Sequence, residues 1–85
     1  MNSNKILISI YIPTIEKIYD LFIPINKKIG TIKSLIESFL IEVTEGIYVV
    51  TEDSNFYDKD TGLPYDVNET VKDTSLKNGS EIILI

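Results

Sequence analysis

The sequence predicts an α+β fold in which a mixed sheet of four or five strands packs on one helix. Three observations predict it: two alternating β-branched segments open the chain, one amphipathic helix follows them, and a strand-like apolar segment closes it. The closing segment needs burial because it is almost wholly apolar, so we expect it to pair beside the first strand. A chain of 85 residues is long enough for one domain, and we expect that domain to span residues 1–85.

The first two strand-like segments alternate between an apolar face and a mixed face. Residues 5–12 place isoleucine at every second position, and period two is typical of a half-buried strand. Pro13 ends this strand because proline has no N–H group to donate to a sheet. Residues 18–23 repeat the alternation up to Pro24, and the charge of Asp20 marks its face as the outer one. The two segments therefore predict an N-terminal hairpin.

A helix is predicted over residues 32–43. Apolar residues recur there at spacings of three and four, the pattern of an amphipathic helix. They are Ile32, Leu35, Ile36, Phe39, Leu40 and Val43. Thr31 precedes the pattern as the expected N-cap, and Gly46 follows it as the expected C′ residue.

The C-terminal half predicts further strands separated by turns. Residues 47–51 are β-branched and aromatic and form the expected third strand. Residues 53–69 are polar and rich in turn residues, and we expect a short fourth strand within them. Residues 70–73 predict a helical turn capped by its threonine, and Asn78-Gly79 predicts a tight turn before the closing strand over residues 81–85.

Composition excludes several classes of chemistry. The chain has no cysteine and no histidine, so disulfides, thiolate metal sites and Ser–His or Cys–His dyads are impossible within it. A net charge of −5 with no arginine argues against nucleic acids and anionic membrane surfaces as partners. No apolar run approaches the roughly 20 residues that span a bilayer, so direct membrane insertion is not expected. The short run 6–12 also lacks a cleavage site of small residues, which argues against a signal peptide.

The acidic loop invites comparison with a calcium site. Asp58, Asp60 and Glu69 have the spacing of positions one, three and twelve of an EF-hand loop. However, Gly62 comes one residue early and Pro64 disturbs the loop. We therefore expect a solvated acidic turn, no metal and no cofactor. Carboxylates on an exposed loop also lack the cleft that acid–base catalysis needs, so we expect no enzyme activity.

The C-terminal third resembles ubiquitin. Its threonine-apolar-x-aspartate turn at residues 70–73 is followed by Leu76, by the turn 78–80 and by the apolar strand 82–85, which is ubiquitin's closing order without gaps. Thr31-Ile32 at the helix start also matches. The resemblance implies the β-grasp fold, and it covers most of the chain apart from the long loop described above.

The sequence departs from ubiquitin at its end, because it has no terminal Gly-Gly and closes on Ile85. Conjugation and sulfur transfer are therefore not expected. A tailless ubiquitin-like protein of this length is similar to the YukD/EsaB family of Gram-positive bacteria. That resemblance implies a non-conjugating accessory or regulator of type VII (WXG100, Ess) secretion. It also implies a cytoplasmic location, peripheral to a membrane complex, with membrane-embedded secretion components as protein partners.

Strand alternation predicts an apolar patch on the face of the sheet that points away from the helix. We expect its residues to bind a protein partner; they are Leu7, Tyr11, Phe22, Tyr48, Ile83 and Ile85, with Val50 as the alternative to Tyr48. Three alternatives stay open. The loop 53–69 could cover the patch. The isoleucines could be exposed only because the composition of the chain is biased toward isoleucine. The patch could also join two copies as a homodimer or other structural assembly. Binding of a peptide along an edge strand, and a role as a toxin or inhibitor partner, also remain open.

Overall fold

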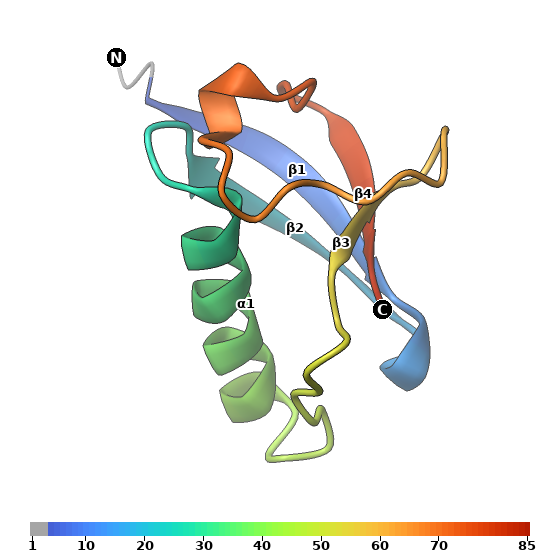
Figure 1. Cartoon of the computed structure of the whole chain (residues 1–85). Coiled ribbons are helices and arrows are strands. Elements are labelled where there is room, and N and C mark those ends of the chain that lie inside the picture. Colours follow the sequence, from blue (N-terminus) through green and yellow to red (C-terminus); the bar gives the residue numbers. More distant parts are fainter. Residues whose placement is uncertain (1–3) are drawn as a thin grey trace.

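The structure, a computed structural model, describes residues 4–85. Strands and one α-helix alternate with two short 3-10 turns along the chain (Figure 1). The elements in chain order are β1 (Lys5–Ile12), a 3-10 turn (Pro13–Ile15), β2 (Lys17–Pro24), α1 (Ile29–Val43), β3 (Phe56–Asp58), a 3-10 turn (Val71–Asp73) and β4 (Ser80–Leu84). The expected hairpin, helix and closing strand are all present.

The strands form one mixed four-stranded sheet in the order β2-β1-β4-β3. The N-terminal hairpin is antiparallel, with Ile8 opposite Leu21. β4 runs parallel to β1, with Ile10 opposite Ile82, and β3 pairs antiparallel with the other side of β4. The prediction that the last strand lies beside the first is confirmed.

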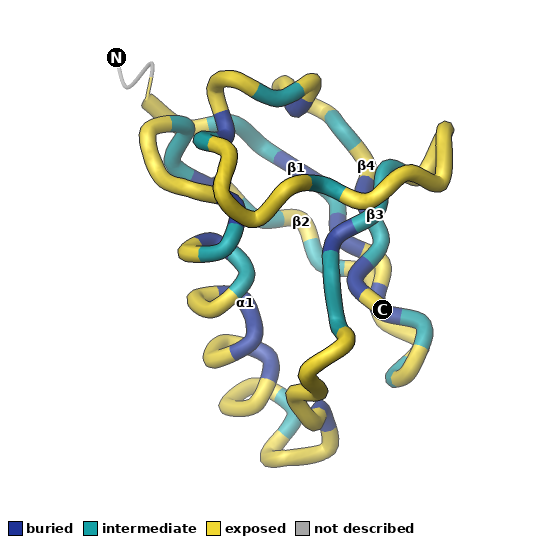
Figure 2. Tube along the Cα trace, viewed as in Figure 1, coloured by how far each residue is buried: buried dark blue, intermediate teal, exposed yellow. Residues whose placement is uncertain are grey.

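The core lies between α1 and one face of the sheet (Figures 1 and 2). The inward residues of β1 and β4 are buried, as the alternation predicts, except Ile6 and Ser80 at the strand starts, which are half-buried. The core's largest fully buried side chains include Ile8, Ile10, Ile12, Ile32, Leu40, Phe56, Ile82 and Leu84. On α1, however, Leu35, Phe39 and Val43 remain 39–58% exposed. Only the part of the predicted apolar stripe that faces the sheet is buried.

The start of α1 corrects the predicted cap. The helix begins at Ile29, so Thr31 lies inside its first turn and does not cap it. Two of the unpaired N–H groups of the first turn are satisfied by distant carbonyls: Ile29 donates to Glu69 at 2.8 Å and Gly30 donates to Val67 at 2.9 Å. These long-range bonds replace the side-chain cap that a local motif would supply. The helical turn predicted at residues 70–73 is confirmed at Val71–Asp73, although Thr70 makes no side-chain cap bond.

The end of α1 is a Schellman motif, displaced by one residue from the prediction. Glu45 occupies the C′ position with a positive φ of 53°, and Gly46 follows it at C″ with φ 83°. The Gly46 N–H donates to the Ile41 carbonyl at 2.9 Å, and the Glu45 N–H donates to the Glu42 carbonyl at 3.2 Å. A glutamate therefore takes the left-handed position that glycine usually fills.

The predicted third strand at residues 47–51 is wrong, because this segment joins no sheet. The place beside β4 is taken by β3, where Phe56 lies opposite Leu84. Asn55 and Ile85 exchange two backbone hydrogen bonds of 3.0 and 3.2 Å and extend that pairing. The short fourth strand expected within residues 53–69 is thus the third strand of the structure.

Candidate protein-interaction surface

The outer face of the sheet carries an apolar row that crosses all four strands. Tyr11 of β1 lies opposite Ile18 of β2 and opposite Ile83 of β4, and Ile83 lies opposite Tyr57 of β3. Side chains at directly opposed positions on one face are in contact range. Ile18 is 67% exposed and Tyr11 is 38% exposed, while Ile83 and Tyr57 are half-buried. Ile85 follows Ile83 on the same face and is also exposed.

A polar row separates this apolar row from a second apolar pair. Ser9 lies opposite Asp20 on one side and opposite Glu81 on the other. The Ser9 hydroxyl donates to the Asp20 carboxylate at 2.7 Å, and Lys59 forms an ion pair with Glu81. The hydrogen bond that Lys59 donates to Glu81 and the charge of that carboxylate raise the pKa of Lys59. Because the bonds lie within one face, the polar row forms a fixed band across the sheet.

Beyond the polar row, Leu7 lies opposite Phe22. Leu7 is half-buried, whereas Phe22 is 67% exposed. Five of the six predicted patch residues therefore lie on the outer face, but they form two apolar groups and not one continuous patch. A shallow hollow of about 260 Å³ opens where the apolar row meets the polar row; its walls are Ser9, Tyr11, Ile18, Lys59, Glu81 and Ile82.

The loop after β3 leaves most of the outer face open. It folds back on itself, with Asp58 donating from its N–H to the Leu63 carbonyl at 2.9 Å and Tyr65 donating to the Phe56 carbonyl at 2.9 Å. In Figure 1 this loop, residues 59–66, projects beyond the sheet, and we call it the arm. Lys59, at the base of the arm, is the residue that reaches the outer face, through Glu81. Tyr11, Phe22 and Ile85 keep their exposure.

Tyr48 is the sixth predicted patch residue, and its predicted place on the outer face is wrong. It is 5% exposed and belongs to the core. Its backbone N–H donates to the Thr44 hydroxyl at 2.9 Å, and its own hydroxyl donates to Glu37 at 3.0 Å. These two bonds turn the side chain toward α1. Val50, the alternative to Tyr48, is 47% exposed but lies on the irregular segment and not in the sheet.

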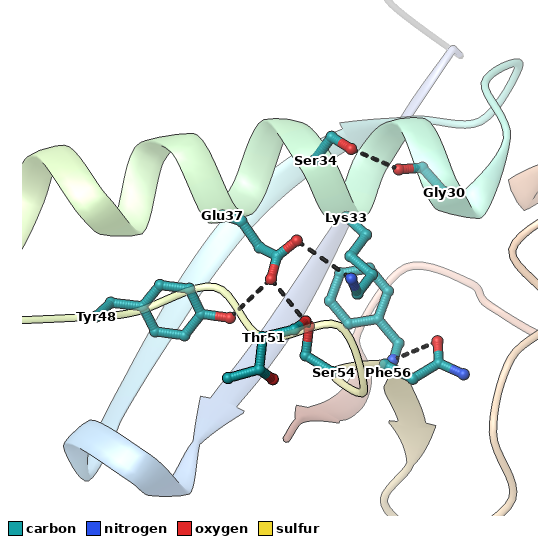
Figure 3. A network of polar contacts seen from close by, with 9 residues as sticks. Gly30, Lys33, Ser34, Glu37, Tyr48, Thr51, Ser54 and Phe56 are labelled. Carbon is teal, nitrogen blue, oxygen red and sulfur yellow. Dashed lines mark hydrogen bonds and ion pairs between the residues drawn. The ribbon is translucent and has the colours of Figure 1, made fainter.

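Glu37 is the centre of a buried polar network on the helix side (Figure 3). One carboxylate oxygen accepts hydrogen bonds from Tyr48 and from the Ser54 hydroxyl, each at 3.0 Å. The other oxygen accepts one from Lys33 at 3.2 Å, which is also an ion pair at helical spacing. Burial raises the pKa of the Tyr48 hydroxyl, and the carboxylate beside it raises that pKa further. The network joins the middle of α1 to both ends of the segment 48–54.

The acidic loop is a hydrogen-bonded turn. One carboxylate oxygen of Asp58 accepts from the N–H groups of Asp60 and Thr61, at 2.7 and 3.1 Å. These backbone donors, Thr61 foremost, hold the pKa of Asp58 below its usual range. The Tyr65 hydroxyl donates to the second oxygen at 3.3 Å, and burial raises the pKa of that hydroxyl. Within residues 4–85, no three acidic side chains converge as a metal site would require.

Sequence reasoning missed Ile18 and Tyr57 as members of the apolar row. Ile18 carries the right signal, since it shares the outer face of its strand with Asp20 and Phe22, whereas the sequence pattern assigns Tyr57 to no face. The pairing partner of each strand was the missing information, because only the register places Ile18 and Tyr57 in line with Tyr11 and Ile83.

Comparison with known proteins identifies the fold. No protein-family model and no curated protein matches this sequence. Among solved structures, the chain is similar to the ubiquitin-like domain of the Mycobacterium tuberculosis type VII secretion system protein ECCD1, with 18% identity and a TM-score of 0.73, over 95% of this chain and 97% of that one. It is also similar to the ubiquitin of Caldiarchaeum subterraneum, with 14% identity and a TM-score of 0.67, over 94% and 90% of the two chains.

A third neighbour is a chain of the MycP5-free ESX-5 inner membrane complex, at 11% identity and a TM-score of 0.74. It matches 96% of this chain, which spans 21% of that longer chain. At these identities the likeness establishes the fold alone. The chain has the ubiquitin-like β-grasp fold, with a mixed four-stranded sheet packed on one helix. Over residues 4–85, no helix has the length and apolar character of a membrane span.

Proposed function

We propose that this chain is a non-catalytic protein-binding adaptor that serves a type VII secretion assembly as an accessory or regulator. The observation that carries the proposal is the apolar row on the outer face. Its members come from four strands, with Ile18 and Tyr11 exposed and Ile83 half-buried beside them. A soluble domain seldom leaves such a row uncovered unless another protein binds it.

The structural neighbours support the secretion context. The ECCD1 domain belongs to a type VII secretion system protein, and the ESX-5 chain belongs to an inner membrane complex. Two neighbours of one kind favour this assembly over the other settings in which ubiquitin-like domains occur. Membrane-embedded secretion components are then the partners, and the adaptor works at the cytoplasmic side of their complex. The YukD/EsaB resemblance leads to the same assembly.

The ionisable groups with shifted pKa values support a role without catalysis. Asp58 is bonded to its own loop, Tyr48 is buried against Glu37, and Lys59 is paired with Glu81. Each shift has a structural cause within the fold, whereas a catalytic group needs a free face toward a substrate. We therefore assign these groups to stability and the apolar row to function.

The test is affinity capture of the tagged protein from its own host, read by mass spectrometry. The variant is Tyr11→Ser with Ile18→Ser, which removes the two exposed members of the row. Leu63→Ser is the matched control, because Leu63 is 65% exposed, nearly as much as Ile18, but lies on the arm. Circular dichroism of the purified proteins confirms that all three are folded.

We expect the wild type and the Leu63→Ser control to recover membrane-embedded secretion components, and the double variant to lose them. Recovery of those components by the double variant would remove the apolar row from the proposal. Recovery of the chain's own copies alone would replace the adaptor role with self-association through this face. Recovery of unrelated partners would discard the secretion assignment and keep the fold.

A further inference from the structure

A second surface lies on the helix side of the molecule, at the C-terminal end of α1, and has no part in the function proposed above. It comprises residues 41–53, the last turn of α1 and the irregular segment that replaces the predicted strand. We call it the connection surface. Its exposed apolar side chains are Ile41, Val43, Ile47, Val49 and Val50. Ile47 is 73% exposed and Val49 is 68% exposed, which places them among the most exposed large apolar residues of the described chain.

The connection surface also holds most of the net charge. Glu42, Glu45, Glu52 and Asp53 are all exposed, and residues 34–58 contain no lysine. These four acids contribute −4 of the chain's net −5, and the remaining nine acids and eight lysines leave −1. The acidic character suggested by the composition is therefore concentrated at one end of the molecule. A field of one sign attracts segments of the opposite charge and repels like ones.

The segment is held in place from within. The Schellman motif fixes its start, and the bonds from Tyr48 and Ser54 to Glu37 fix its middle and end (Figure 3). With Tyr48 turned inward, its neighbours Ile47 and Val49 face solvent, as Figure 2 shows for most of this segment. A surface that is already ordered loses little conformational entropy when a partner binds it. The bonds to Glu37 thus hold the segment so that the β-branched side chains of Ile47 and Val49 point to solvent. No element of the described chain covers them.

The surface continues onto the helix and into a hollow beside β2. Ile41 follows Lys33 and Glu37 at intervals of four residues, so these three lie on one stripe of α1. On the other side, Val43 and Ile47 share a hollow of about 640 Å³ with Tyr19. Glu45 also lines this hollow, and Lys17 of β2 contributes a cation to its wall. Apolar side chains therefore alternate with carboxylates around this end of the molecule.

We propose that the connection surface is a docking site for a lysine- or arginine-rich amphipathic segment of a partner protein. The apolar side of such a segment covers Ile47 and Val49, and its cations meet the four carboxylates. Charge selects this occupant over the others. A second copy of the chain would bring another −4 against the first, and a nucleic acid or an anionic membrane would be repelled. The inference rests on this surface alone and does not depend on the secretion assignment.

The test is an NMR titration of the ¹⁵N-labelled protein with three synthetic peptides of equal length. One is an amphipathic leucine–lysine peptide, one replaces its lysines with glutamate, and one replaces its leucines with serine. The variants are Ile47→Ser with Val49→Ser, and the quadruple change Glu42→Gln, Glu45→Gln, Glu52→Gln and Asp53→Asn. Leu63→Ser is the apolar control, and Asp60→Asn with Asp66→Asn is the charge control on the arm.

We expect the leucine–lysine peptide to shift amide signals within residues 41–53 and to bind both controls as it binds the wild type. Either surface variant should bind it at least about tenfold more weakly, because it loses either two branched side chains that the peptide would bury or several charge contacts. Equal binding of the leucine–glutamate or serine–lysine peptide would overturn the proposal, as would shifts confined to Tyr11, Ile18 and Ile83. Concentration-dependent self-association through residues 41–53 would assign the surface to a second copy.

Discussion

At the residue scale, Glu37 has the largest structural role of the charged groups. It is 5% exposed and accepts hydrogen bonds from Tyr48, Ser54 and Lys33, so each of its two carboxylate oxygens has a donor. A buried charge is tolerable when it is paired and hydrogen-bonded, and removing one partner leaves part of it unsatisfied. No sequence signal marks this role, because Glu37 lies outside the apolar spacing that predicts the buried face of the helix.

Removing the Tyr48 hydroxyl tests the network directly. Tyr48→Phe keeps the ring in the core but takes one donor from the buried carboxylate. We expect the free energy of unfolding to fall by about 1–2 kcal/mol, measured by urea denaturation. Tyr11→Phe is the matched control, since Tyr11 is 38% exposed, and we expect it to stay within about 0.5 kcal/mol of the wild type. An equal effect of the two changes would mean that the network adds no stability.

The same hydroxyl predicts alkaline sensitivity. Tyrosine in the unfolded chain ionises near pH 10.0, whereas burial and Glu37 raise the pKa of Tyr48 in the folded state. Above pH 10.0 the folded state therefore keeps a proton that the unfolded state has lost. Stability is complete below that pH and falls as the pH rises.

Urea denaturation at a series of pH values above neutrality checks this dependence. We expect Tyr48→Phe to lose less stability than the wild type as the pH rises past the unfolded tyrosine value. Tyr65→Phe should flatten the profile as well, because burial raises the pKa of that hydroxyl too. A Tyr48→Phe profile parallel to that of the wild type would contradict the assignment.

At the element scale, tertiary bonds decide where elements begin and end. The sequence pattern correctly predicts that α1 exists, but its first turn is completed by carbonyls of residues 67–69. Residues 47–51 have strong strand propensity and still form no strand, because β3 occupies the edge of β4 and Glu37 holds Tyr48 against the helix. Propensity describes a segment alone, whereas these outcomes depend on partners far away in the sequence.

The end of α1 offers a stabilising substitution. Glu45 adopts φ 53°, a left-handed conformation that costs an ordinary residue about 1 kcal/mol relative to glycine. We expect Glu45→Gly to raise the free energy of unfolding by about that amount in urea denaturation. Glu45→Ala removes the same charge but keeps the β-carbon, so it should stay within about 0.5 kcal/mol of the wild type. A matching gain in both variants would assign the effect to charge and not to backbone strain.

At the scale of the whole molecule, the sequence is sufficient for the fold class and insufficient for the interaction surface. Period-two and helical patterns identify β1, β2, α1 and β4, and the ubiquitin-like order of the C-terminal third predicts their arrangement. The sequence predicts the outer face of the sheet in part, since strand alternation correctly places Tyr11, Phe22 and Ile83 on it. Its division into two apolar groups depends on cross-strand register, and the connection surface depends on a misjudged strand. Neither the division of the outer face nor the connection surface can be predicted from any single segment of the sequence.

The topology predicts an order of local stabilities. β1 and β4 lie at the centre of the sheet with a partner on each side, whereas β2 is an edge and residues 47–53 belong to no sheet. The Ile25 N–H donates to the Asn4 carbonyl, and that bond indicates which N–H groups along β2 point toward β1 and which point away from it. By this alternation, the amides of Tyr19, Leu21 and Ile23 point toward β1, and those between them point to the open edge.

Native-state hydrogen exchange measures this order residue by residue. We expect the amides of β1 that pair with β2 or β4 to exchange only through global unfolding, because breaking the central strands disrupts the whole core. Along β2, Tyr19, Leu21 and Ile23 should be protected while Ile18 and Phe22 exchange faster. Amides of residues 49–53 should exchange by local opening, and Tyr48→Phe should speed them before it affects β1. Uniform protection along β2 would mean that its edge is covered, and then a second copy of the chain must pair there.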